Sequence, residues 1–150
     1  MKIAYVYDAV YPWEKGGAQK RIFELARRLV ENYEVHLYGM QYWNGPSVVE
    51  REGIVYHGVC EPQELYINGR RSISQALHFA TEVTGSLLRD VNEYDVIDIS
   101  VFPYFPTLTV KACTILQNTP LVTTWHEVWG SYWVCKPCSI HSSWKRLTLQ

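Results

Sequence analysis

The first thirty residues constrain the fold of this chain more than any other stretch. Residues 3–7 form a short apolar run, IAYVY, which is typical of a strand buried on both faces of a sheet. Residues 8–17 then form a loop that ends in two adjacent glycines, Gly16 and Gly17. From Ala18 onward, apolar residues recur at helical spacing. A strand, a glycine loop and an amphipathic helix in this order predict the opening of a parallel βα unit.

The glycine pair is a candidate anion site, because a helix N-terminus leaves backbone N–H groups free and carries partial positive charge. The alternative is a turn in which glycine only supplies unusual backbone angles. The sequence contains neither the dinucleotide fingerprint G-x-G-x-x-G nor the phosphate-binding pattern G-x-x-x-x-G-K-[ST]. These absences disfavour a nicotinamide enzyme and a nucleotide triphosphatase.

Strand-like runs alternate with helical patterns along the rest of the chain. This order predicts right-handed parallel crossovers and an α/β fold with a doubly wound, mainly parallel, Rossmann-like sheet. Residues 40–53 and 60–70 are expected to be connections. The other expected elements are strands at residues 34–39, 54–59, 94–100 and 120–124, and helices from about residue 72 to 89 and from about 107 to 116.

Composition narrows the class of protein. The 150 residues are 47% hydrophobic and 19% charged, which fits one globular domain rather than a disordered chain. A net charge of −1 gives no basic footprint for a nucleic-acid partner. No apolar run approaches the roughly 20 residues that span a bilayer, and the N-terminus lacks a signal-peptide pattern. We therefore expect a cytoplasmic protein with no transmembrane segment, able at most to associate peripherally with a membrane.

The carboxyl edge of the predicted sheet is where a ligand should bind. Aromatic residues make up 14% of the chain and gather in the loops expected at that edge, which suits stacking on sugar rings or contact with an apolar or lipid group. Burial beneath another domain is the alternative. These residues are Tyr11, Trp13, Tyr42, Trp43, Tyr66, Phe102, Tyr104, Phe105, Trp125, Trp129, Tyr132 and Trp133.

His126 is the best single candidate for a catalytic or ligand-binding role, because it follows a strand end and its ordinary pKa lies near physiological pH. The alternative is a histidine that only bonds a neighbouring carbonyl. His36 and His57 lie inside expected strands and His78 on the flank of a helix, so we interpret all three as structural.

Four carboxylates at strand or loop positions are weaker candidates. Asp8 and Glu14 could contact hydroxyl groups, although a solvated loop carboxylate is the commoner case. Asp95 and Asp98 start and interrupt one expected strand, so turn formation or bonding within the fold is the favoured interpretation.

Cys135 and Cys138 have C-x-x-C spacing, and His141 follows three residues later. A structural zinc site usually needs four ligands, and the sequence has no second such pair. A thioredoxin-like motif should follow an early strand and open a helix, which this one does not. We expect no metal and no cofactor, and keep a small metal- or thiol-using protein as a third interpretation.

The residues now indicate a family. The opening, MKIAYVYDAVYPWEKGGAQKRIFELARRL, resembles that of GT-B glycosyltransferases of the glycogen-synthase-like, retaining group called family 4. The stretch DVIDISVFPYFPTLTVKACTILQNTPLVTTWHEVWG resembles the later part of their N-terminal domain. The resemblance covers about residues 1–130, and the glycine pair combined with the strand-end histidine is its most specific part.

The resemblance implies an acceptor-side lobe whose partner lobe binds most of a nucleotide-sugar donor. It implies that Gly16 and Gly17 approach the donor phosphates or sugar, and that His126 lies beside the transferred sugar. Transfer would proceed with retention at the anomeric carbon and without a required metal, to a sugar or lipid-linked acceptor. The aromatic residues that we assign to the acceptor or sugar are Tyr11, Trp13, Phe102, Tyr104 and Trp129.

The sequence departs from the family in two respects. It has no counterpart of the donor-binding domain with its paired-glutamate motif, and residues 134–150 lose the family pattern. We expect residues 1–133 to form the acceptor-side domain, residues 134–150 an irregular tail, and the gene product to be truncated, split or frame-shifted. Such a chain should be inactive alone and need a C-terminal partner domain. The alternative is a non-catalytic binding module, for example a homodimer formed through the aromatic edge.

Overall fold

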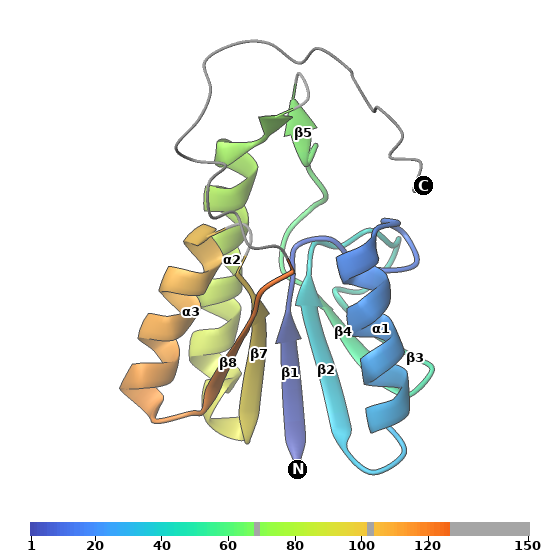
Figure 1. Cartoon of the computed structure of the whole chain (residues 1–150), viewed down its shortest axis with the longest axis vertical. Coiled ribbons are helices and arrows are strands. Elements are labelled where there is room, and N and C mark those ends of the chain that lie inside the picture. The colour runs from blue at the N-terminus through green and yellow to red at the C-terminus, as the bar shows by residue number, and fades with distance from the viewer. Residues whose placement is uncertain (68–69, 102–103, 127–150) are drawn as a thin grey trace, which may run out of the picture.

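The computed structural model describes residues 1–67, 70–101 and 104–126 (Figure 1). Helices and strands alternate along these residues as the sequence predicts. In chain order the elements are β1 (Lys2–Val6), α1 (Gly17–Leu29), β2 (Glu34–Gly39), β3 (Val48–Arg51), β4 (Ile54–Gly58), β5 (Tyr66–Ile67), β6 (Arg70–Arg71), α2 (Ile73–Asp90), the short 3₁₀ helix η1 (Val91–Glu93), β7 (Val96–Ser100), α3 (Tyr104–Gln117) and β8 (Leu121–Thr124).

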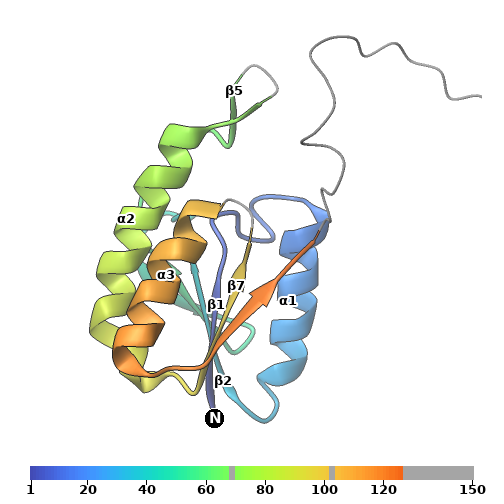
Figure 2. The same ribbon diagram turned by 60° about the vertical axis from the view of Figure 1, so that its left-hand side comes forward.

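The described residues form three layers. A six-stranded sheet in the order β3-β4-β2-β1-β7-β8 is parallel except for β3 at one edge. Helix α1 covers one face of this sheet, and α2 and α3 pack together on the other (Figure 2). The predicted doubly wound, mainly parallel, Rossmann-like sheet is therefore confirmed.

Strand β1 lies at the centre of the sheet and is buried on both faces. It pairs in parallel with β2 on one side and with β7 on the other. Side chains alternate between the faces of a strand, so Ile3 and Tyr5 join the core beneath α1, while Ala4 and Val6 join the core beneath α2 and α3. An almost continuous apolar run is what such a position requires.

Helix α2 forms because its sequence satisfies both its start and its buried face. The Ser72 hydroxyl accepts a hydrogen bond from the Gln75 backbone N–H (3.2 Å), which caps the first turn. Phe79, Val83 and Leu87 recur at four-residue spacing and are fully buried against the sheet.

Three local predictions were wrong. Residues 40–53 are not only a connection, because β3 pairs antiparallel with β4 there. Residues 60–70 are not only a loop, because β5 and β6 form a short antiparallel pair. Helix α3 begins at Tyr104 rather than near Thr107, so Tyr104 and Phe105 lie in a helix and not in a loop.

His36 and His57 make contacts within the fold, which supports the interpretation of both as structural residues. His36 Nδ1 lies 2.7 Å from His57 Nε2, and its Nε2 lies 2.8 Å from Glu34 Oε1. The Tyr38 ring stacks on His57 at 4.3 Å between centroids. Burial and the neighbouring His36 lower the pKa of His57 to about 4.

Replacement of Phe79 tests the packing of α2. Phe79→Ala should lower the free energy of unfolding by about 3–5 kcal/mol, because the ring is 1% exposed and its loss leaves a cavity. Leu77→Ala is the matched control on the same helix, since Leu77 is 46% exposed and its loss should cost about 0.5 kcal/mol or less. Urea denaturation followed by circular dichroism measures both values. Equal losses would contradict the placement of α2.

The histidine pair predicts a pH dependence of stability. The folded-state pKa of His57 lies below its unfolded value, so the unfolded chain binds more protons, and stability present above about pH 6.5 is lost as the pH falls toward 4. His57→Gln should reduce the loss between pH 7 and 4.5 by roughly 1 kcal/mol, a value reduced because solvent screens a partly exposed ring. His78→Gln is the control and should leave the pH dependence of wild type. Identical slopes for wild type and His57→Gln, in urea titrations at each pH, would refute the assignment.

Candidate functional site

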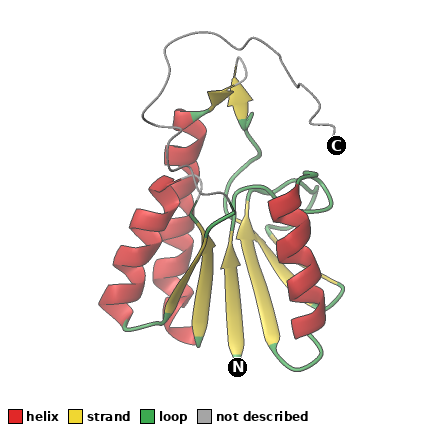
Figure 3. Cartoon of the chain, in the orientation of Figure 1, coloured by secondary structure: helices red, strands yellow, loops and turns green. Residues whose placement is uncertain are grey.

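The strand order places the candidate site beside β1. The parallel strands lie in the order β4-β2-β1-β7-β8. Successive strands are thus added on one side of β1 as far as β4 and on its other side from β7 onward, so the strand order reverses between β1 and β7. The segments after these two strands lead to α1 and α3, which lie on opposite faces of the sheet (Figure 2). Ligands of doubly wound sheets bind outside the carboxyl ends of the strands at such a reversal. Loops gather at this edge in Figure 3.

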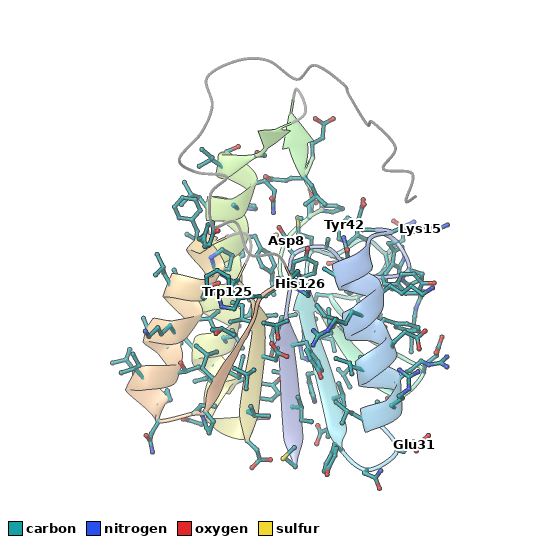
Figure 4. All side chains as sticks on the ribbon, in the orientation of Figure 1. Asp8, Lys15, Glu31, Tyr42, Trp125 and His126 are labelled. Carbon is teal, nitrogen blue, oxygen red and sulfur yellow. The ribbon has the colours of Figure 1, made fainter. Side chains whose placement is uncertain are left out.

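The two ends of the described chain bring their candidate residues to this same edge. Gly17 begins α1, which follows β1, and His126 follows β8. Figure 4 shows Asp8, Lys15, Tyr42, Trp125 and His126 around the carboxyl ends of the strands, whereas Glu31 lies at the opposite end. The glycine loop and the strand-end histidine are therefore parts of one edge.

The N-terminus of α1 is open at Gly17 but not at Gly16, where an added Cβ would clash with the Gln19 side chain. Its N-cap residue, Gly16, has an extended backbone (φ −162°, ψ 167°) and gives no side-chain cap, and no acidic residue occupies the first turn. A Cβ added at Gly17 would meet nothing within 4 Å. Neither glycine has a positive φ, so unusual backbone angles do not account for the pair. An open helix N-terminus is compatible with an anion or sugar in front of it.

His126 is exposed at the end of β8 and approaches the end of β1. Its ring centroid lies 6.1 Å from that of Tyr7, with the planes tilted by 51°. Tyr7 directly follows β1, whose next loop leads to Gly16 and Gly17. The contact brings the histidine to the strand reversal, where a ligand is expected.

Asp98 lies on the sheet face that α1 covers. It stands opposite Tyr5 in the β1–β7 register, and its Oδ1 accepts a hydrogen bond from the Thr124 hydroxyl (2.7 Å). Burial raises the pKa of Asp98, while the Thr124 hydrogen bond and the positive charges of Arg21 and His126 oppose this rise. Burial and the Asp98 carboxylate together raise the pKa of Tyr5.

Sequence reasoning placed Asp98 correctly within the fold but did not connect it to His126. The available signal was the alternation of strand side chains, which puts Asp98 and Thr124 on one face once β7 and β8 are paired, with His126 two residues past Thr124. That pairing register depends on the whole sheet and is not readable from either strand alone.

The residues assigned to the acceptor have different surroundings. Tyr11 packs on Phe23 at 4.9 Å between ring centroids, and Trp13 packs on Trp43 at 5.2 Å, with the Arg51 guanidinium over its ring. Tyr104, at the start of α3, is 38% exposed. Phe102 and Trp129 lie outside the described residues. A role in binding an acceptor stays a prediction for all five of these aromatic residues.

Only some of the aromatic side chains expected at the carboxyl edge are exposed. Trp125 is 61% exposed, and Phe105 is exposed at the start of α3. Trp43 is instead 6% exposed and belongs to the core beneath α1, so this ring does not face a ligand. Asp8 is not the solvated loop carboxylate that is commonest at such positions. It is fully buried and accepts a hydrogen bond from Gln75 Nε2 (3.1 Å).

Cys60 and Cys113 are free thiols in the described part of the chain. Burial raises the pKa of the Cys60 thiol to about 11 and also raises the pKa of Cys113. No group of three or more metal-binding side chains occurs among residues 1–67, 70–101 and 104–126. Cys135, Cys138 and His141 lie outside these ranges. None of the helices described has the length and apolar composition needed to cross a bilayer.

Known structures with this arrangement define the class of fold. Sucrose-phosphate synthase from Thermosynechococcus elongatus superposes with a TM-score of 0.66 at 11% identity, covering 91% of this chain and 35% of the synthase. The C-terminal domain of the PF1911 hydrogenase from Pyrococcus furiosus gives a TM-score of 0.52 at 11% identity, covering 81% of this chain and 89% of that domain. The chain has the Rossmann-like lobe of a GT-B glycosyltransferase, and spans about a third of the length of the synthase.

The sequence profile of glycosyltransferase family 4 matches residues 15–148. The chain therefore belongs to glycosyltransferase family 4. A search of curated protein sequences gave no match.

The open position at Gly17 yields a stability prediction. Gly17→Ala should leave the free energy of unfolding unchanged or raise it by up to about 1 kcal/mol, because alanine favours the helix and its Cβ meets no other atom. Gly85→Ala, at an equally open position inside α2, is the matched control and should raise stability by about 0.5–1 kcal/mol. Thermal and urea unfolding measure both. Destabilisation by Gly17→Ala alone would show that the glycine serves the fold.

Proposed function

We propose that this domain is the acceptor-side lobe of a retaining glycosyltransferase that transfers a sugar from a nucleotide-sugar donor. The single observation that carries the proposal is the shared edge of His126 and the α1 N-terminus, linked through the contact between His126 and Tyr7. An open helix N-terminus favours a phosphate or an electron-rich sugar oxygen. A neighbouring imidazole can donate a hydrogen bond to a sugar hydroxyl.

In the proposed reaction the donor lies between this lobe and a donor-binding lobe. The backbone N–H groups at Gly16 and Gly17 approach the donor phosphates or sugar, and His126 contacts the sugar that is transferred. Both walls are needed, because orientation and electrostatic stabilisation come from groups fixed on either side of the reacting atoms. We therefore propose that the 150-residue chain has negligible transferase activity alone and requires a C-terminal lobe, and that no metal takes part.

The acceptor is proposed to be a sugar or a lipid-linked sugar. The exposed rings of Tyr104, Phe105 and Trp125 at the carboxyl edge support this class of acceptor, since aromatic faces stack on sugar C–H groups and contact apolar chains. Tyr11 and Trp13 stand in the loop before α1 and complete the proposed acceptor side.

Transfer assays test the proposal, with UDP-glucose as the first probe and the donor-binding lobe of a family 4 enzyme supplied as a fusion. The fusion should turn over the donor, with product of retained anomeric configuration by NMR, and the chain alone should not. His126→Ala should slow the fusion by about 10²–10³-fold, the usual effect of removing one preorganised polar contact with a transition state. Gly17→Ala should weaken donor binding, measured by calorimetry.

His78→Ala is the control, because His78 is half-buried on α2, which packs on the sheet face opposite α1, and it should keep wild-type turnover. Equal rates for His126→Ala and His78→Ala would refute the assigned site. Turnover by the isolated chain would refute the need for a second lobe.

A non-catalytic binding or dimerisation module is the second candidate. The observation that favours it is the outer side of α3, where Leu108, Ile115 and Leu116 are exposed and apolar. Self-association in analytical ultracentrifugation, without binding of any nucleotide sugar by chain or fusion, would favour this function over transfer.

A further inference from the structure

A carboxylate lies at a sheet position where one is unusual. Asp98 is in the middle of β7, with β1 on one side and β8 on the other. Aspartate is depleted in strands, particularly where a sheet is covered, because burial disfavours its charge. A carboxylate in such a strand needs a hydrogen-bonding or oppositely charged partner, or has a functional role.

The pairing of strands fixes what stands around Asp98. Tyr5 is opposite it on β1, and Ser100 is opposite Thr124 on β8. Because side chains two residues apart share a face, Asp98 and Thr124 lie on the side of the sheet that α1 covers. The Thr124 hydroxyl donates to Asp98 Oδ1 at 2.7 Å, which fixes one end of the carboxylate.

His126 follows Thr124 by two residues, just past the end of β8. Its ring contacts Tyr7, which itself lies two residues beyond Tyr5. Asp98 and His126 interact electrostatically, and Arg21 of α1 supplies the other positive charge near the carboxylate. The titratable and charged groups described around this pair are thus Arg21 and Tyr5 near Asp98, and Tyr7 beside His126.

We propose that Asp98, held by Thr124, is a positioning residue that stabilises the protonated form of His126 at the carboxyl edge. The inference rests on the proposed function in taking His126 as the residue that faces the sugar. A protonated imidazole donates hydrogen bonds through both ring nitrogens, so it favours ligand atoms that accept them, namely sugar hydroxyl or phosphate oxygens. A neutral imidazole offers one donor and one acceptor. Asp98 therefore biases the site toward oxygen-rich anionic ligands.

NMR titration of the histidine rings in the 150-residue chain tests this without any donor. Asp98→Asn should lower the titration midpoint of His126 by about half a pH unit or more, because an opposite charge nearby favours the protonated ring. Asp95→Asn is the matched control. It removes the same charge from a carboxylate at the opposite end of the sheet, bonded to the Lys2 backbone N–H, and should leave the midpoint in place. His126→Gln assigns the resonance.

The reciprocal measurement keeps the proposal testable if Asp98→Asn does not fold. His126 is exposed, so His126→Gln should fold, and the midpoint of the Asp98 carboxyl should rise when the positive ring is removed. An Asp98→Asn effect no larger than that of Asp95→Asn, or an unchanged Asp98 midpoint in His126→Gln, would overturn the inference.

Activity separates this inference from the proposed function. In the active fusion, Asp98→Asn should move the alkaline limb of the rate profile to lower pH, and Asp98→Glu should restore it in part. Coupled titrations together with transfer that is insensitive to His126 would retain the inference and refute the assigned role of His126. Uncoupled titrations together with transfer that depends on His126 would refute the inference and retain the assigned role of His126.

Discussion

The pairing of β1 with β2 and β7 is the constraint on which the rest of the structure depends. In the described sheet, β1 lies between β2 and β7. The chain continues from β1 through α1 to β2 on one side, and β7 later pairs with β1 on the other side. The sheet buries apolar surface on both faces, one beneath α1 and one beneath α2 and α3, and β1 and β2 contribute side chains to both. Loss of β1 would leave two incomplete layers, and the strand reversal that locates the site would not exist.

The same arrangement places stabilising polar contacts and candidate functional residues at opposite ends of the strands. Near the amino ends, polar groups are satisfied within the protein: His36 bridges His57 and Glu34, and Lys2 contacts Glu34 and Glu93. Near the carboxyl ends, Gly17 is open, and His126 and Trp125 are exposed. In the proposed transferase, this open edge is the one that a second lobe and two substrates would share.

The sequence predicted the layers well because they depend on long periodic segments. The apolar run of β1, the helical spacing of α2 and the Ser72 cap each carry a local signal. Strand β3 was missed for a physical reason: it joins β4 through a two-residue turn at Glu52 and Gly53, both with positive φ. Such turns usually carry Asn-Gly or Asp-Gly, and glutamate is uncommon in that conformation. The burial of Trp43, likewise, results from packing against Trp13 and Tyr56, which no local pattern encodes.

The contact between Tyr7 and His126 has a consequence for how this molecule reaches its native state. It joins Tyr7, which follows the first strand, to His126, the last described residue, so almost the whole described sequence separates the two rings. Contacts of this kind require closure of a long loop and form slowly relative to local ones. β8 pairs with β7, and β7 pairs with β1, so His126 reaches Tyr7 only when both pairings have formed. The edge that holds the candidate site is therefore complete only in a chain that has closed this long loop.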